Sequence, residues 1–410
     1  MSGPPGDLVA RLRALPGMSL LLPALDGLAP AHLVGGAVRD LLRGERSVDL
    51  DLCTEHDAHE LAGALAERLG GTDRRHERFA TATVSARDLE IDVARTRRER
   101  YPRPGALPEV EPAPLAEDLG RRDFTVNAMA LGLSGEELGR LRDPLGGSED
   151  LSAARIRVLH ERSFLDDPTR LLRAVRYEVR LGARMDAETE RLVREAVNAR
   201  ALDTVSGPRV RDELLDLLAE AEVPDAVARL DELGLDRALH PALEADASLA
   251  AGAALAALET GADRVLAVLA ALVSRSPEQL RPWIDRLGLR AAVRDRVMRA
   301  ARSGPALTEA LAVERSPSQL HELLRGEPAE ALALALALGA PAPPVLRYVA
   351  DLREVRLEVT GAELIDAGVP PSPALGRALE ETLRRKLDGE VSGHEEELRL
   401  ALELAGGAQR

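Results

Sequence analysis

The 410-residue sequence contains one cysteine, Cys53, and its aromatic residues amount to only 2% of the chain. A single cysteine cannot form a disulfide within the chain or supply a cysteine-built zinc site. No run of 18 apolar residues is present, so neither a membrane span nor a membrane partner is expected. The N-terminus has no basic stretch followed by an apolar one, so secretion is not expected and the predicted location is the cytosol.

Positive charge is also scarce, because 54 Lys and Arg residues face 69 Asp and Glu residues and the net charge is -15. An acidic chain with few aromatic rings is atypical of nucleic-acid-binding proteins. The charge is unevenly distributed, since residues 151–211 hold 13 arginines and 9 acidic residues. This segment predicts a local basic surface within an acidic protein. The sequence carries no signal for an oligomeric state.

Patterns along the chain predict an α/β head followed by an all-α neck and tail. Runs typical of strands lie at 32–36, 48–53, 80–86 and 89–94, and a helical run lies at 56–70. Residues 101–120 carry five prolines and two glycines, which predicts a long loop. Apolar residues recur at helical spacing from Pro168 almost to the end. The expected domains are a head (1–150), a neck (151–225) and a body and tail (226–410).

A glycine pair joins the first expected strand to a helix in HLVGGAVRDLLRG. Gly35 and Gly36 would let backbone N–H groups approach phosphate oxygens closely, and the helix N-terminus adds positive potential. Arg39, in the first turn of that helix, would reach the same anion. A tight turn without a ligand is the alternative interpretation of this junction.

The strand VDLDL places Asp49 and Asp51 two residues apart, so both carboxylates project from one face of the sheet. Leu50 and Leu52 are then expected to point into the core. Neighbouring carboxylates repel unless a cation lies between them, and oxygen ligands suit Mg²⁺. Asp92, in the strand LEIDVA, is the expected third carboxylate. A solvated strand face is the alternative.

Two further segments carry clustered charge. In RRDFTVNAMA, Arg121 and Arg122 are suited to clamp triphosphate oxygens, and Asn127 to bond a ribose hydroxyl or a nearby loop. The alternative is a capped helix whose arginine and aspartate side chains pair at the surface.

In DDPTRLLRAVR, Asp167 precedes Pro168, which suits a helix start, and Arg170 follows three residues later. Arg173 and Arg176 continue the stripe of arginines that Arg170 begins. A carboxylate can accept from an exocyclic amine while a guanidinium donates to the adjacent ring nitrogen. Adenine and cytosine present that pair, and guanine and uracil do not. The segment predicts selection of ATP and CTP if the two side chains face the metal site, and a plain helix start otherwise.

Six ordered motifs across roughly residues 30–215 together resemble the class II tRNA nucleotidyltransferases and bacterial poly(A) polymerases, a branch of the polymerase-β-like nucleotidyltransferases. They are GGAVRD with DLD, IDVARTRRERYPRPGALPEVE, EDLGRRDFTVNAMAL, DPLGGSEDL, IRVLHERSFLDDPTRLLRAVRYEVRLG and GPRVRDELLDLL. The resemblance implies that Asp49 and Asp51 bind the metal. It also implies nucleotide-binding roles for Gly36, Arg39, Arg121, Arg122, Asp123, Asp167, Arg170, Arg173 and Arg176, and a loop at 97–120 linked to switching from C to A addition.

The implied reaction is template-independent addition or repair of the 3′-terminal CCA of tRNA from CTP and ATP, with Mg²⁺ as cofactor and pyrophosphate as product. The head would catalyse, the neck would bind the base and RNA, and the body and tail would bind tRNA. Enzymes that add only A or only CC share these motifs and remain alternatives. A poly(A) polymerase is disfavoured by the acidic C-terminus, and an inactive RNA-binding scaffold by the retained motif residues.

Overall fold

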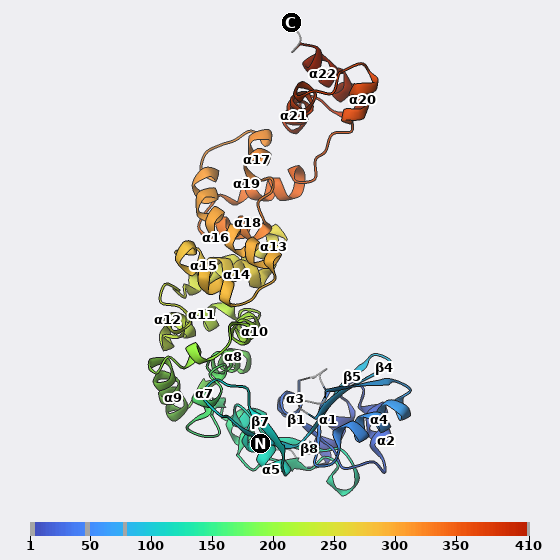
Figure 1. The fold of residues 1–410 in the computed structure, drawn as a ribbon, viewed down its shortest axis with the longest axis vertical. Coiled ribbons are helices and arrows are strands. Elements are labelled where there is room, and N and C mark those ends of the chain that lie inside the picture. Colours follow the sequence, from blue (N-terminus) through green and yellow to red (C-terminus); the bar gives the residue numbers. More distant parts are fainter. Residues whose placement is uncertain (1–4, 46–49, 77–79, 408–410) are drawn as a thin grey trace. The chain divides into compact units, whose positions relative to one another are not determined.

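The computed structural model describes residues 5–45, 50–76 and 80–407. Contacts divide the chain into two compact units (Figure 1). The first comprises Met1–Glu222 and Glu232–Leu239, and the second comprises Val223–Asp231 and His240–Arg410. The finer division into a head (1–150), a neck (151–225) and a body and tail (226–410) stays a prediction.

A mixed sheet forms the centre of the first unit. In the described residues it has seven strands in the order β3-β4-β5-β2-β1-β8-β9. Strand β2 runs parallel to β5, and the other neighbours run antiparallel. The strands are β1 (His32–Val34), β2 (Leu50–Thr54), β3 (Thr72–His76), β4 (Thr81–Ala86), β5 (Leu89–Arg95), β8 (Ala130–Gly132) and β9 (Leu141–Arg142).

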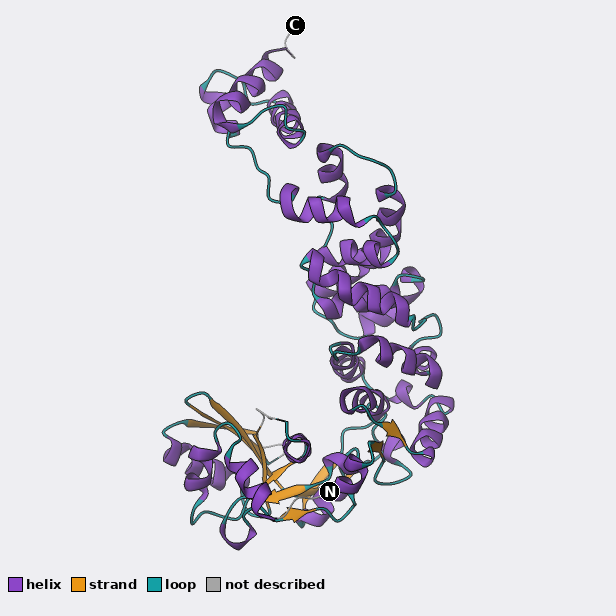
Figure 2. Cartoon of the chain, turned by 180° about the vertical axis from the view of Figure 1, so that it is seen from behind, coloured by secondary structure: helices purple, strands orange, loops and turns teal. Residues whose placement is uncertain are grey.

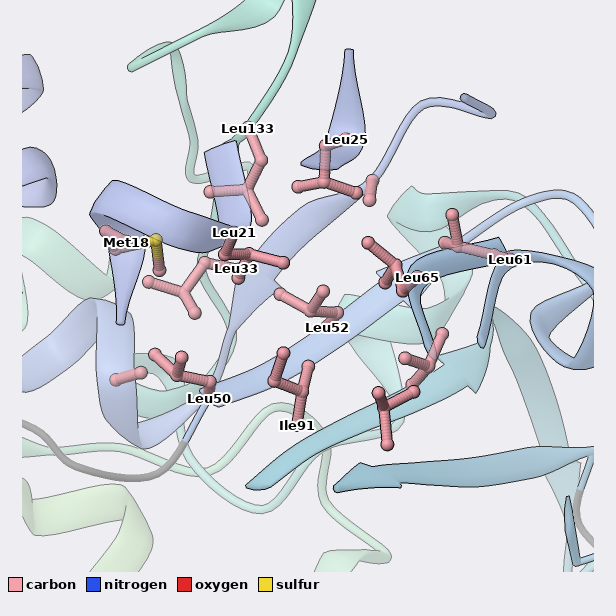
Figure 3. Packing of buried hydrophobic residues seen from close by; sticks show 14 of the residues in the cluster. Met18, Leu21, Leu25, Leu33, Leu50, Leu52, Leu61, Leu65, Ile91 and Leu133 are labelled. Carbon is pink, nitrogen blue, oxygen red and sulfur yellow. The ribbon is translucent and has the colours of Figure 1, made fainter. Parts of the chain in front are cut away.

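One face of this sheet is covered by α2 (Met18–Leu25) and α4 (Ala58–Leu69). In Figure 3, Leu50, Leu52 and Ile91 of the strands point toward leucines of these helices. Leu50 and Leu52 are only 2% and 1% exposed, which confirms their predicted place in the core. Because side chains alternate along a strand, Asp51 and Asp92 project from the opposite face.

The opposite face carries a smaller apolar cluster against α5 (Leu115–Gly120). Val34, Cys53 and Ala130 of the sheet pack there with Leu119. Cys53 is buried, and burial raises the pKa of its thiol to about 12. Helix α5 therefore lies on the side of the sheet that carries the aspartates.

Short helices and strands complete the first unit. Helix α8 packs on α10, and β10 pairs in parallel with β11. The elements are α1 (Pro5–Arg13), α3 (Gly36–Arg43), β6 (Arg97–Arg100), β7 (Glu109–Pro112), α6 (Gly147–Ser152), β10 (Arg155–Ile156), α7 (Ser163–Asp166), α8 (Arg170–Leu181), β11 (Arg184–Met185), α9 (Ala187–Asn198), α10 (Gly207–Leu218) and α12 (Leu235–Leu239), with 3₁₀ turns at Thr125–Asn127, Gly135–Glu137 and Ala201–Thr204.

The second unit is helical throughout its described residues, as Figure 2 shows in purple. Gly304 of α16 lies directly against Leu334 of α18, so a small residue lets these helices approach closely. The helices are α11 (Val223–Leu233), α13 (Ala247–Thr260), α14 (Arg264–Val273), α15 (Pro277–Arg286), α16 (Ala291–Leu311), α17 (Pro317–Leu324), α18 (Ala329–Ala337), α19 (Ala342–Arg347), a π turn (Tyr348–Leu352), α20 (Gly361–Asp366), α21 (Pro373–Leu387) and α22 (Gly393–Gly407).

The predicted fold class is confirmed, since a mixed α/β head precedes a helical region. Across the described residues, no helix has the length and apolarity needed to cross a membrane.

The prediction of one long loop over residues 101–120 is wrong, because this segment contains β7 and α5. Strand β7 pairs only with β6 among the described residues, so its one proline, Pro112, interrupts no larger sheet. The edge strand β3 was not predicted either, since its sequence TDRRH lacks alternating apolar residues.

Candidate active site

A cavity of about 530 Å³ lies in the first unit and gathers residues from distant parts of the sequence. Its walls come from α3, β2, the segment after α5, and α8. The structure thus brings together most of the residues predicted from sequence. Those that line the cavity are Gly35, Gly36, Arg39, Asp51, Arg121, Arg122, Asp123, Asn127, Asp167, Arg170 and Arg173.

The glycine pair forms the predicted junction between β1 and α3. Gly35 has φ +68° and ψ -133°, a conformation that side-chain-bearing residues rarely adopt. A Cβ on Gly35 would lie 3.1 Å from Nη1 of Arg122. The absence of a side chain therefore permits both the turn and the close approach of a guanidinium to the N-terminus of α3.

Arg39 lines the cavity but is already held by protein partners. Its side chain is buried, and its Nη1 donates to Oδ1 of Asn127 at 2.7 Å. Its Nε donates to Asp40 at 2.8 Å, and its guanidinium carbon lies 5.2 Å from the centre of the Tyr177 ring. Arg39 consequently shapes the wall of the cavity and brings positive charge to it.

Asp123 is a buried carboxylate with strong partners. Its Oδ1 accepts from the amide of Asn127 at 3.0 Å, and its Oδ2 accepts from Nη2 of Arg173 at 2.7 Å. Burial alone would raise the pKa of this carboxyl, but the charge of Arg173 and these hydrogen bonds lower the pKa to about 2. Asn127 therefore links Arg39 of α3 to Asp123, and its predicted contact to a ribose hydroxyl or a nearby loop stays a prediction.

Arg121 and Arg122 are oriented by acidic residues that were not among the predicted site residues. Oδ1 of Asp118 accepts from Nε of Arg121 at 2.9 Å, and Oδ2 accepts from Nη2 of Arg122 at 3.0 Å. Burial raises the pKa of Asp118, but the two arginine charges outweigh it and lower that pKa. Glu99 of β6 accepts from Nη1 of Arg121 at 2.7 Å. The spacing of three and four residues between Asp118 and the arginines was the available signal.

One donor of this arginine pair finds no partner in the part of the chain that the structure describes. Nε of Arg122 is buried and makes no hydrogen bond among the described residues. A buried guanidinium donor without a partner is costly, which is typical of a position that a ligand completes. Tyr101 also lines the cavity and donates from its hydroxyl to Glu99 at 3.0 Å.

Asp167 and Arg170 both face the cavity, as the base-recognition hypothesis requires. The expected helix start differs slightly, since α8 begins at Arg170 and Asp167 accepts from the backbone and hydroxyl of Thr169. Arg170 donates to Ser163 at 2.8 Å and to the backbone carbonyl of Arg121 at 2.7 Å. These bonds use two of its five N–H groups and leave others for a ligand.

Arg173 and Arg176 extend along α8, but only Arg173 lines the cavity. Arg173 also donates to Glu213 at 2.9 Å, whereas Arg176 pairs with Asp216 of α10. These acidic residues of α10 were likewise missed, since their distance in sequence from α8 gives no local signal. Direct nucleotide contact by Arg176 stays a prediction.

The predicted metal-binding carboxylates lie partly outside the described residues, because Asp49 falls in the range 46–49. Asp51 pairs in register with Asp92 across the parallel strands β2 and β5, and both are exposed on one face. Oδ1 of Asp92 accepts from the hydroxyl of Thr83 at 2.7 Å. The described residues contain no complete group of three metal-binding side chains, but this pair offers the oxygen donors that Mg²⁺ prefers.

Comparison with known proteins agrees with this architecture. Residues 31–157 match the family described as "Poly A polymerase head domain". Residues 182–246 match the family described as "Probable RNA and SrmB- binding site of polymerase A". A sheet that presents carboxylates beside an arginine-lined cavity, followed by helices, is therefore the architecture of a nucleotidyltransferase.

The relatives identify the family within the nucleotidyltransferases. An A-adding tRNA nucleotidyltransferase of Geobacter sulfurreducens is 35% identical over 92% of this chain and 46% of its own length. A CC-adding tRNA nucleotidyltransferase of Deinococcus radiodurans is 36% identical over 92% of this chain and 89% of its own length. A solved CCA-adding enzyme complexed with CTP is 30% identical, with a TM-score of 0.81, over 99% of this chain and 98% of that one. The chain belongs to the tRNA nucleotidyltransferase family, although it spans less than half the length of the Geobacter relative.

Proposed function

We propose that the protein builds or repairs the 3′-terminal CCA of tRNA by adding nucleotides from CTP and ATP. The observation that carries this proposal is one cavity that combines anion-binding groups with a carboxylate and a guanidinium suited to a base. In the proposed reaction the 3′-hydroxyl of tRNA attacks the α-phosphorus, and pyrophosphate leaves. The cytosolic location stays a prediction.

The triphosphate would lie against the glycine junction and the two arginines. Backbone N–H groups at the start of α3 and the unpaired Nε of Arg122 supply donors for its oxygens. Asp118 and Glu99 hold Arg121 in place, so little side-chain entropy is lost when phosphate binds. These contacts would orient the α-phosphorus toward the aspartates of β2 and β5.

The base would be selected by Asp167 and Arg170. The Asp167 carboxylate would accept from the exocyclic amine of cytosine or adenine, and Arg170 would donate to the neighbouring ring nitrogen. Guanine and uracil would present a carbonyl to the carboxylate and leave two acceptors facing each other. This chemistry supports use of CTP and ATP without a nucleic-acid template.

Mg²⁺ fits the carboxylate pair of Asp51 and Asp92, and Asp49 would complete its ligands. When bound, the ion would offset phosphate charge and make the attacking hydroxyl more acidic. The neck would contact the base and the end of the RNA, and the helical body and tail would bind the rest of the tRNA. This division of roles follows the prediction made from sequence.

Addition of A alone is the second candidate. The relative from Geobacter, which shares 35% identity with this chain, carries that name. The cavity itself suits both bases, which is consistent with full CCA addition. Enzymes that add only A share the same motif residues, so an extension assay decides between the two. Addition of CC alone is the third candidate, because the relative from Deinococcus carries that name, and the same assay tests it.

Extension assays separate these candidates. Purified protein with Mg²⁺ receives tRNA lacking CCA or tRNA ending in CC, with each nucleotide alone or with CTP and ATP together. The proposal predicts complete CCA on the first tRNA and a single A on the second, with Asp51→Asn as the inactive control. If the protein extends only the CC-ended tRNA, the A-adding candidate replaces the proposal of full CCA addition. Long A tails would indicate a poly(A) polymerase.

A further inference from the structure

Arg209, near the start of α10, bridges the base-reading carboxylate and the turn that follows β6. Its Nη2 donates to Oδ1 of Asp167 at 2.8 Å, and its Nη1 donates to the carbonyl of Gly105 at 2.9 Å. A guanidinium makes such a two-pronged contact in one fixed plane, which lysine does not. Arg209 itself is outside the lining of the cavity, so its influence on a bound nucleotide would be indirect.

The bonds to Asp167 are unevenly shared between its two oxygens. Oδ1 accepts from Arg209, from the Thr169 backbone at 3.1 Å and from the Thr169 hydroxyl at 2.7 Å. These donors saturate Oδ1, and no bond from the described residues reaches Oδ2. A base amine in the cavity would therefore be received by Oδ2.

The second partner of Arg209 is itself held firmly. Gly105 has φ +69°, and a Cβ there would lie 2.2 Å from Oγ1 of Thr204. Its N–H donates to the carbonyl of Asp166 at 3.3 Å. The turn thus lies directly against the segment that carries Asp167, and it fixes one prong of the guanidinium while the other holds the carboxylate.

We infer that Arg209 is a positioning residue for base selection, because it holds Oδ1 of Asp167 and so directs Oδ2 toward the incoming base. This inference rests on the proposed function. Without Arg209 the carboxylate would be freer to turn about its bond to Cβ, and a water molecule could enter between it and a carbonyl-bearing base. Selection against GTP and UTP would then weaken, even though Asp167 itself is retained.

The test compares Arg209→Ala with the wild-type protein in single-turnover addition of each of the four nucleotides to tRNA. We expect the preference for CTP and ATP over UTP and GTP to fall about tenfold, the worth of one charge-assisted hydrogen bond. Arg211→Ala, two residues further along the same helix, is the matched control and should keep the wild-type preference. Arg209→Lys, which retains one prong, should fall between them and is informative if the alanine variant folds poorly.

A double variant separates positioning from a general structural effect. In an Asp167→Ala background, adding Arg209→Ala should leave the remaining preference unchanged, because the residue acts through that carboxylate. Independent, multiplicative losses would overturn the inference, as would an unchanged preference in the single variant.

Equilibrium binding of the four nucleotides without RNA separates this inference from the proposed reaction. Selective binding by a protein that extends no tRNA, with selectivity lost in Arg209→Ala, would reject the reaction and retain the role of Arg209. Normal tRNA extension with unaltered selectivity in Arg209→Ala would reject the role of Arg209 and retain the proposed reaction.

Discussion

At the scale of single residues, two aspartates in one cavity differ because of their partners. Asp123 is buried with both oxygens occupied, and the charge of Arg173 outweighs burial and keeps its pKa low. Asp167 keeps one oxygen without a bond from the described residues. These partners fit a structural role for Asp123 in the cavity wall and the proposed role of Asp167 in recognition of the base.

Gly35 provides the first prediction. Gly35→Ala should destabilise the fold by roughly 1–3 kcal/mol, because alanine is strained at this φ and ψ. It should also lower nucleotide affinity about tenfold, because the new Cβ would lie 3.1 Å from Nη1 of Arg122 and displace this guanidinium. The displacement would cost about one charge-assisted hydrogen bond to phosphate. Thermal unfolding and nucleotide titration measure the two effects.

Gly27 offers a matched control for this prediction. It has φ +69°, and a Cβ there would meet nothing within 4 Å. Gly27→Ala should lose stability but keep its nucleotide affinity. Equal losses of affinity in the two variants would show that backbone strain, rather than the contact with Arg122, explains the effect.

The carboxylate pair gives a prediction about metal. Removal of divalent ions with a chelator should abolish nucleotide addition, and Mg²⁺ should restore it. Asp92→Asn should raise the Mg²⁺ concentration needed for half-maximal activity by about tenfold or more. Asp88→Asn, in the turn between β4 and β5, is the control and should match the wild type. An unchanged Mg²⁺ requirement in Asp92→Asn would remove this residue from the metal site.

At the scale of elements, the alternation of apolar and polar residues along a strand predicted which face of the sheet each side chain occupies. The burial of Leu50 and Leu52 placed Asp51 on the other face, and the same argument placed Asp92. The ribbon of β6 and β7 was missed because its residues follow neither a clean alternation nor a helical period. Glu99 was missed with it, since its role depends on pairing with Arg121 across the fold.

The link between Asp123 and Arg173 of α8 predicts a pH dependence. The folded pKa of Asp123 is about 2, below the ordinary value of 3.8, so this carboxylate stabilises the fold above about pH 4. That contribution, about 2 kcal/mol at neutral pH, declines as the pH falls toward 2. The difference in unfolding free energy between wild type and Asp123→Asn should therefore shrink by roughly 1 kcal/mol from pH 5 to pH 3.

Urea unfolding at the two pH values measures this difference, and Asp88→Asn again serves as the control. A difference that stays constant between pH 5 and pH 3 would contradict the assigned pairing. A difference that grows on acidification would mean that Asp123 is more easily protonated in the folded protein than in the unfolded chain.

At the scale of the whole molecule, the charge distribution differs from what arginine counts suggest. Many arginines of the segment 151–211 pair with nearby carboxylates, as Arg191 does with Glu188 and Glu195. Arg173 and Arg176 pair with acidic residues of α10. Local composition therefore overstates the positive potential that this segment offers to RNA. The acidic residues of α10 are far from Arg173 and Arg176 in the sequence, so these ion pairs could not be identified from one sequence.

The division into two units predicts the behaviour of a fragment. Residues 1–240 include the whole first unit, with the buried Leu235 and Leu239. This fragment should bind CTP and ATP as the full chain does, but it should extend tRNA poorly because it lacks most of the helical body. Fragment 1–222 should be less stable, since it lacks both buried leucines. Full tRNA extension by fragment 1–240 would contradict the role proposed for the body and tail.

We propose that the protein itself, without a nucleic-acid template, selects cytosine and adenine. Equilibrium binding of CTP, ATP, GTP and UTP to the full chain in the absence of RNA tests it most directly. We predict that CTP and ATP bind at least about tenfold more tightly than GTP and UTP, and that Arg170→Ala reduces this preference for both bases together. Equal affinity for all four nucleotides, or a preference unaltered in Arg170→Ala, would show that Asp167 and Arg170 do not select the base.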